Sequence, residues 1–306
     1  MPPFTQLVRL NVCVFSLLFT FAAATNQSFA EDPLNLLFFG NSFTIGDNVP
    51  NAVGRIAEAD GKARPTIVAD LAGGQDLDYH IGQVNSAPQN NVLSSAIGAG
   101  QFDFAILQGY STEATHLQSP ATDFIPDAVA MSNLLRSFPT ASDAGIILFE
   151  TWAREAPHSF YSGTNPSFAN PAAMQAEIRD NYALASEAIN QAIGQSVAEV
   201  APVGDAFEQG GFDGFLYASD NYHASRQGSR LASLVIYRSI YNENVGDISY
   251  DSVSSWANVS SSEWSTLTSL ADSVQITAIP EPSIVAPLML LSSCCLLKRK
   301  RKTTAV

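Results

Sequence analysis

Short apolar runs recur along the chain, with stretches of helical pattern between them. Five runs are continuous rather than alternating: Leu34–Phe39, Thr66–Leu71, Phe102–Gln108, Gly145–Thr151 and Val197–Val203. Continuous apolarity is typical of strands that are buried on both faces, as in a parallel sheet. We therefore expect a central, mostly parallel, five-stranded sheet.

Segments of helical composition separate these runs. They are Val49–Asp60, Ala121–Phe138 and Ala172–Gly194, and Pro171 suits the first turn of the third. A further helical segment, Ala224–Tyr241, follows the last run. Strands and helices that alternate along one chain predict an α/β fold, a three-layer α/β/α sandwich with right-handed crossovers. Such a fold binds ligands beside the carboxyl ends of its strands.

The first 30 residues have the pattern of a secretory signal peptide. Arg9 precedes an apolar stretch, Leu10–Ala24, and Ser28-Phe29-Ala30 places small residues before a cleavage point after Ala30. A core helix is the alternative interpretation. We expect the protein to be exported, and to lie at the cell surface, in the periplasm or in the extracellular matrix.

The C-terminal end has three features in a fixed order. Pro280-Glu281-Pro282 is followed by an apolar run, Ile284–Leu297, and then by five cations, Lys298–Lys302. The run is shorter than the roughly 20 residues that span a bilayer comfortably. This tail, residues 280–306, resembles the PEP-CTERM sorting signal, which implies transient membrane association and processing by an exosortase-like enzyme. An ordinary tail anchor is the alternative.

The remaining chain divides by composition into a main α/β domain, residues 31–246, and a Ser-rich extension, residues 247–279. Trp256 and Trp264 lie in the extension, where Leu267 and Leu270 have helical spacing. These residues favour a last packed helix over a flexible linker.

Charge and cysteine content exclude several classes of protein. The formal net charge is −14, so the chain repels nucleic acid. Cys13, Cys294 and Cys295 lie only in the two end segments, which leaves no disulfide and no cysteine metal site between them. We find no cofactor motif. The one dense group of possible metal ligands, residues 76–80, is too weak a signal to predict a metal.

A serine stands where the first strand should end. Ser42 follows Gly40-Asn41, and a serine nucleophile needs a base, usually a histidine that a carboxylate orients. His223 is the best-placed histidine, because Asp220 lies three residues before it and a predicted helix begins just after it. A simple turn or helix cap at Ser42 is the alternative.

These two blocks resemble those of the SGNH (GDSL-like) hydrolases, whose first block is Gly-Asp-Ser and whose last is Asp-x-x-His. The resemblance covers roughly residues 34–241. It implies the flavodoxin-like three-layer fold and an ester hydrolase in which Ser42 attacks, His223 transfers protons and Asp220 orients His223.

The resemblance also implies an oxyanion hole built from the N–H of Ser42, a glycine N–H and an asparagine amide. Gly74 is the expected glycine, with Gly73 close behind. The family's third block is absent here, and Gln108, in Leu107-Gln108-Gly109, carries the same amide on a longer stem. We expect Gln108 to replace the asparagine, and a structural hydrogen-bonding role for its side chain is the alternative.

Four further residues are expected to contact substrate: Asn41, His80, Trp152 and Tyr222. Aromatic residues after the fourth run, Trp152 among them, suit stacking on sugar rings. We therefore expect an exported serine esterase that removes short acyl groups, such as acetyl, from carbohydrate such as acylated polysaccharide. The alternative is a non-catalytic glycan-binding or matrix protein on the same scaffold.

Overall fold

The computed structural model describes residues 32–95 and 101–277. The predicted signal peptide and the predicted PEP-CTERM-like tail lie outside the described residues. Where the domain boundaries fall stays a prediction.

The sheet has five parallel strands in the order β2-β1-β3-β4-β5. The strands are β1 Asn35–Gly40, β2 Thr66–Leu71, β3 Phe104–Leu107, β4 Gly145–Phe149 and β5 Ala198–Ala201. The predicted fold class is confirmed. The fifth strand is shorter than expected, because Pro202 has no N–H for the sheet and Val203 already begins the next helix.

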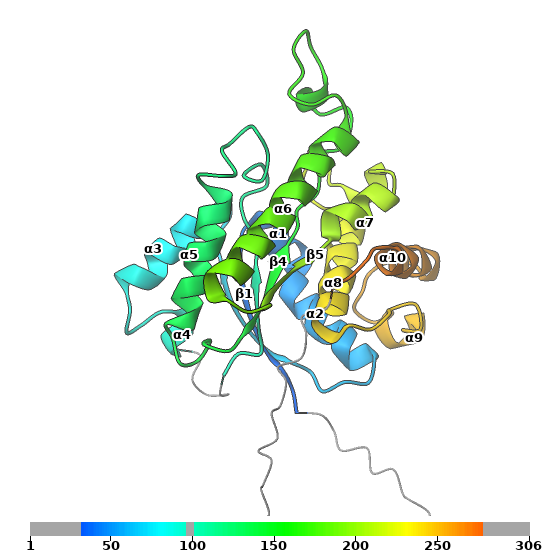
Figure 1. Ribbon diagram of the computed structural model, residues 1–306. Coiled ribbons are helices and arrows are strands. Elements are labelled where there is room, and N and C mark those ends of the chain that lie inside the picture. Colours follow the sequence, from blue (N-terminus) through cyan, green and yellow to red (C-terminus); the bar gives the residue numbers. More distant parts are fainter. Residues whose placement is uncertain (1–31, 96–100, 278–306) are drawn as a thin grey trace, which may run out of the picture. The chain divides into compact units, whose positions relative to one another are not determined.

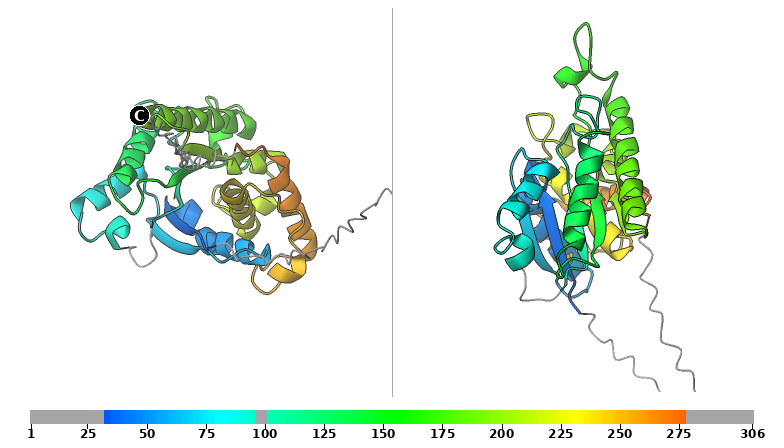
Figure 2. Two further views of the ribbon diagram at one scale, coloured as in Figure 1. Left: turned by 60° about the horizontal axis from the view of Figure 1, so that its bottom comes forward. Right: turned by 60° about the vertical axis from the view of Figure 1, so that its left-hand side comes forward.

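Helices cover both faces of the sheet (Figures 1 and 2). One face packs against α2 Val49–Ala59, α7 Val203–Gln209, α8 Arg226–Tyr241, α9 Tyr250–Val253 and α10 Ser261–Ser273. The other packs against α3 Leu77–Ser86, α4 Val92–Ser95, α5 Phe124–Arg136 and α6 Pro171–Ile193. Short elements complete the list: α1 Ser42–Ile45 and three 3-10 turns, η1 Gly46–Asn48, η2 Ser159–Tyr161 and η3 Gly214–Leu216.

The Ser-rich extension ends in the expected helix, α10. A capping box between Ser260 and Glu263 begins this helix. Trp264 and Leu267 are buried against the core, and Trp264 Nε1 donates to the carbonyl oxygen of Ile248 at 3.0 Å. The extension is therefore packed on the sandwich over its described part.

No helix in the described ranges is both long and apolar enough to cross a bilayer.

Candidate active site

Strand β1 delivers Ser42 to the carboxyl edge of the sheet. The strand ends at Gly40, and α1 begins at Ser42 after a single capping residue, Asn41. Residue 40 must be glycine, because a Cβ there would stand 2.4 Å from Thr44 Oγ1. This close approach lets the chain change from strand to helix within two residues, and it leaves Ser42 half-buried rather than enclosed.

Ser42, His223 and Asp220 form a continuous chain of hydrogen bonds. His223 Nε2 lies 2.9 Å from Ser42 Oγ, and its Nδ1 lies 2.7 Å from Asp220 Oδ2. The serine and the histidine are 181 positions apart in sequence. The fold thus brings together the three residues that the sequence pattern selected, in the order nucleophile, base and orienting acid.

The loop that carries Asp220 and His223 is held by its own backbone. Asp220 Oδ1 accepts hydrogen bonds from the N–H groups of Tyr222 and His223 at 3.1 and 3.0 Å. Asn221 takes a left-handed conformation, with φ of 63°. The N–H of Ala218 donates to the carbonyl oxygen of His223 at 2.8 Å and closes the loop.

These bonds keep Asp220 ionised. Partial burial alone raises its pKa, but the hydrogen bonds from the His223 side chain and from the two N–H groups outweigh burial and leave the pKa below its usual value. A charged Asp220 can accept a hydrogen bond from the Nδ1–H group of His223. Nε2 of His223 is then free to accept a hydrogen bond from the hydroxyl of Ser42.

Trp152 lies beneath this loop and does not face solvent. Its ring stacks between Phe43 and Phe207, with centroids 4.3 and 4.5 Å away and nearly parallel planes. Its Nε1 donates to the carbonyl oxygen of Tyr222 at 2.9 Å. Because Trp152 is 0 % exposed, the expectation that it stacks on a sugar ring is wrong. Trp152 instead supports Phe43, which follows Ser42, and Tyr222, which precedes His223.

Two more expected substrate contacts are buried as well. Asn41 is 2 % exposed, and its side-chain amide donates to the carbonyl oxygens of Gln75 and Gly109. His80 is fully buried, with Nε2 3.1 Å from the carbonyl oxygen of Gly40. Both side chains therefore hold the turn in place. The sequence could not distinguish a substrate contact from a buried structural role at these two positions, because burial depends on how the loops pack.

Tyr222 is the exception among the four, since it is half-buried. Its ring centroid lies 3.9 Å from that of His223. It is the one of the expected contacts that is placed to meet a ligand.

Gln108 does not supply the expected oxyanion donor. It is 0 % exposed, and its Nε2 donates to the carbonyl oxygen of Gly109. Its Oε1 accepts from the N–H of Asn41 at 3.1 Å and from Thr44 Oγ1 at 2.8 Å. The longer stem of glutamine turns the amide into the interior, where it braces the nucleophile's turn.

Main-chain donors remain at the mouth of the site. The N–H of Ser42 is the first of a helix and so has no acceptor within that helix. Gly74 is exposed, with a left-handed φ of 72°. Its loop is tied to the nucleophile's turn through the hydrogen bond from Asn41 Nδ2 to the carbonyl oxygen of Gln75 at 2.9 Å.

Arg154 is the residue at the site that sequence reasoning missed. Its guanidinium lies 4.6 Å from the ring centroid of Tyr222 and 5.7 Å from that of Phe43, and Nη2 donates to Ser111 Oγ at 2.8 Å. Nη1 is buried and has no hydrogen-bond partner in the described part of the chain. Burial lowers the pKa of this guanidinium, which nevertheless stays charged. In the sequence, the only sign that Arg154 belongs to the site is that a cation follows soon after the fourth strand.

The loop after β3 contains a buried acid, Glu113. It is 3 % exposed and accepts a hydrogen bond from the N–H of Tyr110 at 2.8 Å. Burial, helped by the nearby carboxylates of Asp76 and Asp127, raises its pKa to about 7. The loop beside the site therefore contains an acid that titrates near neutrality.

Two cavities lie at opposite edges of the sheet, of about 430 Å³ beside β2 and about 450 Å³ beside β5. Neither is lined by Ser42, Asp220 or His223. In the described ranges no three His, Cys, Asp or Glu side chains gather closely enough to hold a metal ion.

Comparisons with known proteins support the fold. Neither the scan of family models nor the search of curated proteins finds a match. Among solved structures, the chain is similar to a protein described as a candidate SGNH hydrolase from Slackia heliotrinireducens, with 24 % identity and a TM-score of 0.51 over 68 % of this chain and 98 % of that one. It is also similar to a DUF4886 family protein from Bacteroides uniformis, with 18 % identity and a TM-score of 0.58 over 81 % and 98 % of the two chains.

At these identities the likeness concerns the fold. The sandwich with sheet order 2-1-3-4-5 is an α/β fold of the SGNH hydrolase type.

Proposed function

We propose that this protein is a serine ester hydrolase that works through an acyl-enzyme. The observation that carries the proposal is the hydrogen-bond chain from Ser42 through His223 to Asp220. A half-buried serine with a base 2.9 Å away, and a carboxylate on the far side of that base, is the arrangement that nucleophilic acyl transfer requires.

The proposed reaction has two halves. His223 Nε2 takes the proton of Ser42 Oγ while Oγ bonds to the ester carbonyl carbon. The tetrahedral intermediate then expels the alcohol, whose oxygen receives that proton from His223. Water next gives a proton to His223 and its oxygen to the acyl carbon. The bond from that carbon to Ser42 Oγ then breaks, Oγ receives the proton from His223, and the carboxylic acid leaves. The N–H groups of Ser42 and Gly74 are the proposed donors to the oxyanion.

For the substrate, we propose short acyl esters, such as acetyl groups, on carbohydrate. Predicted export and surface sorting support this choice, because an exported esterase meets acylated polysaccharide. The burial of Trp152 removes one of the aromatic arguments for a sugar. Export by the signal peptide and processing of the tail by an exosortase-like enzyme belong to the same proposal.

A non-catalytic scaffold is the second candidate, and Gln108 favours it. With its amide turned inward, Gln108 does not offer the side-chain oxyanion donor that the resemblance implies, and losing one such donor typically costs about 3 kcal/mol of transition-state stabilisation. The intact hydrogen-bond chain favours the esterase.

Hydrolysis of p-nitrophenyl acetate, butyrate and octanoate tests the proposal. We expect turnover that falls with chain length and is lost in Ser42→Ala and His223→Ala. Two matched controls, Ser255→Ala and His116→Ala, change exposed residues outside the hydrogen-bond chain and should leave activity intact. Equal activity in wild type and Ser42→Ala would reject the proposal.

A further inference from the structure

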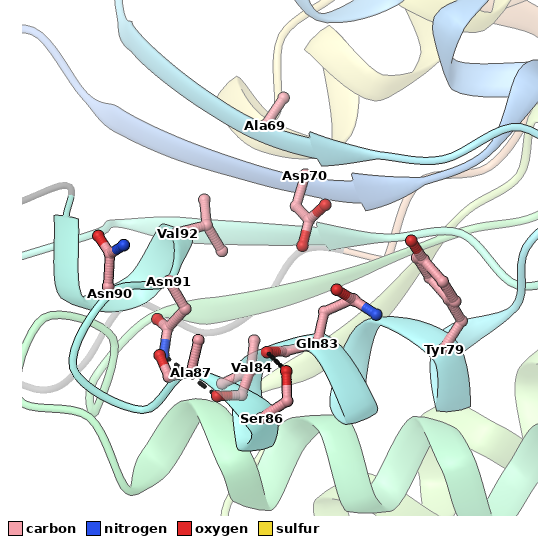
Figure 3. Close-up of a pocket in the computed structure, with 10 residues that line it drawn as sticks. All are labelled: Ala69, Asp70, Tyr79, Gln83, Val84, Ser86, Ala87, Asn90, Asn91 and Val92. Atoms are coloured by element: carbon pink, nitrogen blue, oxygen red, sulfur yellow. Dashed lines mark hydrogen bonds between the residues drawn. The ribbon is translucent and has the colours of Figure 1, made fainter.

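An open polar cavity lies along β2, the edge strand of the sheet. Its volume is about 430 Å³, within the range of about 300–1,000 Å³ that is usual for small-molecule sites. β2, α3 and the start of α4 form its walls (Figure 3). Six polar residues line it: Asp70, Tyr79, Gln83, Ser86, Asn90 and Asn91.

Polar groups from different elements meet in this cavity. Figure 3 shows the carboxylate of Asp70, from β2, and the amide of Gln83, from α3, directed into the same space, with Tyr79 at one end. Tyr79 is 37 % exposed. In the described part of the chain the side chain of Gln83 has no hydrogen-bond partner, so its amide can both donate to and accept from a ligand.

The composition of the lining excludes several ligand classes. Among the described residues the lining contains no lysine, arginine or histidine, and the carboxylate of Asp70 repels anions. One carboxylate is too few for a calcium site. The apolar residues in the described part of the lining are alanine and valine, which offer little surface to a large apolar ligand. A neutral ligand with many hydroxyl groups satisfies a carboxylate, amides and a phenol together.

The cavity is adjacent to the nucleophile's turn. Asp70 pairs in register with Phe39, three residues before Ser42. The buried His80 lies between the cavity and the turn: its Nδ1 has no hydrogen-bond partner and lies 3.5 Å from Asp70 Oδ2, while Nε2 lies 3.1 Å from the carbonyl oxygen of Gly40. The fully buried Nδ1 of His80 is thus directed at the carboxylate that a ligand would meet.

We propose that this cavity is a carbohydrate subsite. It holds one sugar unit of a neutral polysaccharide while an ester on another unit of that polysaccharide reaches Ser42. The inference rests on the proposed esterase function. The alternative ligand is an extended peptide that adds a strand along the edge of β2, which would bind mainly through main-chain hydrogen bonds. The converging side chains favour the sugar.

Binding to neutral oligosaccharides tests the subsite. The full chain with Ser42→Ala is titrated calorimetrically with xylohexaose, cellohexaose and mannohexaose. We expect at least one to bind, and Gln83→Leu and Tyr79→Ala to weaken its affinity at least tenfold. Gln89→Leu is the matched control, because Gln89 is exposed on the loop after α3 and outside the lining; it should bind as before.

Activity on two esters separates this inference from the proposed function. With Ser42 intact, Gln83→Leu should raise KM for an acetylated neutral polysaccharide several-fold and leave kcat/KM for p-nitrophenyl acetate unchanged. Binding without esterase activity in the wild type would reject the function and keep the subsite. No hexasaccharide binding, or binding that Gln83→Leu and Tyr79→Ala leave unchanged, would overturn the subsite.

Discussion

The indole nitrogen of Trp152 donates to the carbonyl oxygen of Tyr222 at 2.9 Å, across 70 positions of sequence. Two further hydrogen bonds lie beside it. Tyr217 Oη donates to the carbonyl oxygen of Ala153 at 2.9 Å, and the N–H of Glu155 donates to the carbonyl oxygen of Asn221, also at 2.9 Å. The segment after β4 therefore fixes the loop that presents His223 to Ser42.

Replacing Trp152 by phenylalanine tests this support. Trp152→Phe keeps an aromatic ring between Phe43 and Phe207 but removes the bond to Tyr222. We expect a loss of about 1–2 kcal/mol in the free energy of unfolding. We also expect kcat to fall, because the loop of His223 loses an anchor. Urea unfolding and p-nitrophenyl acetate kinetics give the two numbers. An unchanged kcat would show that the bond does not position the loop.

Arg154 offers a second test, because it is a buried cation in contact with Tyr222 and Phe43, and its Nη1 has no hydrogen-bond partner among the described residues. Arg154→Met removes the cost of burying charge together with the cation–π contacts and the bond to Ser111, so the net change in stability should be small, about 1 kcal/mol or less. Activity should fall because Tyr222 and the loop of His223 lose their packing partner.

Arg154→Lys is the matched variant, since it keeps the charge but loses the planar donor. Partial recovery of kcat in Arg154→Lys relative to Arg154→Met is expected. Full activity in Arg154→Met would contradict a positioning role for the guanidinium.

Gln108 should matter for stability more than for chemistry. Gln108→Leu leaves the N–H of Asn41 and the hydroxyl of Thr44 without their acceptor, so we expect a loss of about 2–4 kcal/mol in the free energy of unfolding. Gln108→Glu, which keeps an acceptor, should be less harmful when protonated at low pH. A normal unfolding curve with a strongly reduced kcat would instead restore Gln108 as an oxyanion donor.

Glu113 makes stability depend on pH. Its folded pKa of about 7 lies above the unfolded value of 4.5, so the folded state binds its proton more tightly. The resulting stabilisation is complete below pH 4.5 and is lost as pH rises through 7. It amounts to about 3 kcal/mol at most. Glu113→Gln keeps the acceptor for the N–H of Tyr110 and removes the charge, so at pH 8 it should unfold at higher urea concentration than wild type.

Urea unfolding at pH 4.5, 6 and 8 measures this dependence. Asp127, whose pKa burial raises to about 6, contributes in the same direction, so Asp127→Asn is the appropriate comparison. Parallel pH profiles for wild type and Glu113→Gln would refute the assignment.

Replacing Asp220 separates orientation from fold. Asp220→Asn keeps the size of the side chain but should lower kcat by about 10²–10⁴, because the amide no longer favours the tautomer of His223 that leaves Nε2 free. Circular dichroism should be unchanged. A kcat within twofold of the wild type would show that Asp220 does not act on His223.

Much of the fold and the core of the site could be predicted from the sequence, for local reasons. Strands buried on both faces appear as continuous apolar runs, and Ser42 and His223 stand out beside their flanking residues. For Gln108, His80 and Trp152 the sequence could not decide between a ligand contact and a structural role, because each has the chemistry of a ligand contact and is buried by loops distant in sequence. Of helix α3 only a start near residues 76–80 could be predicted, because its polar, exposed face hides a sparse apolar pattern at Leu77 and Val84.

The central claim is that His223 activates Ser42, and labelling with a fluorophosphonate probe tests it most directly. The probe is incubated with the wild type, His223→Ala and the control His116→Ala, and the modified peptide is identified by mass spectrometry. We predict a single adduct on Ser42 in the wild type and in His116→Ala, and at least a hundredfold slower labelling in His223→Ala. No adduct on Ser42 in the wild type, or equal labelling without His223, would contradict the claim.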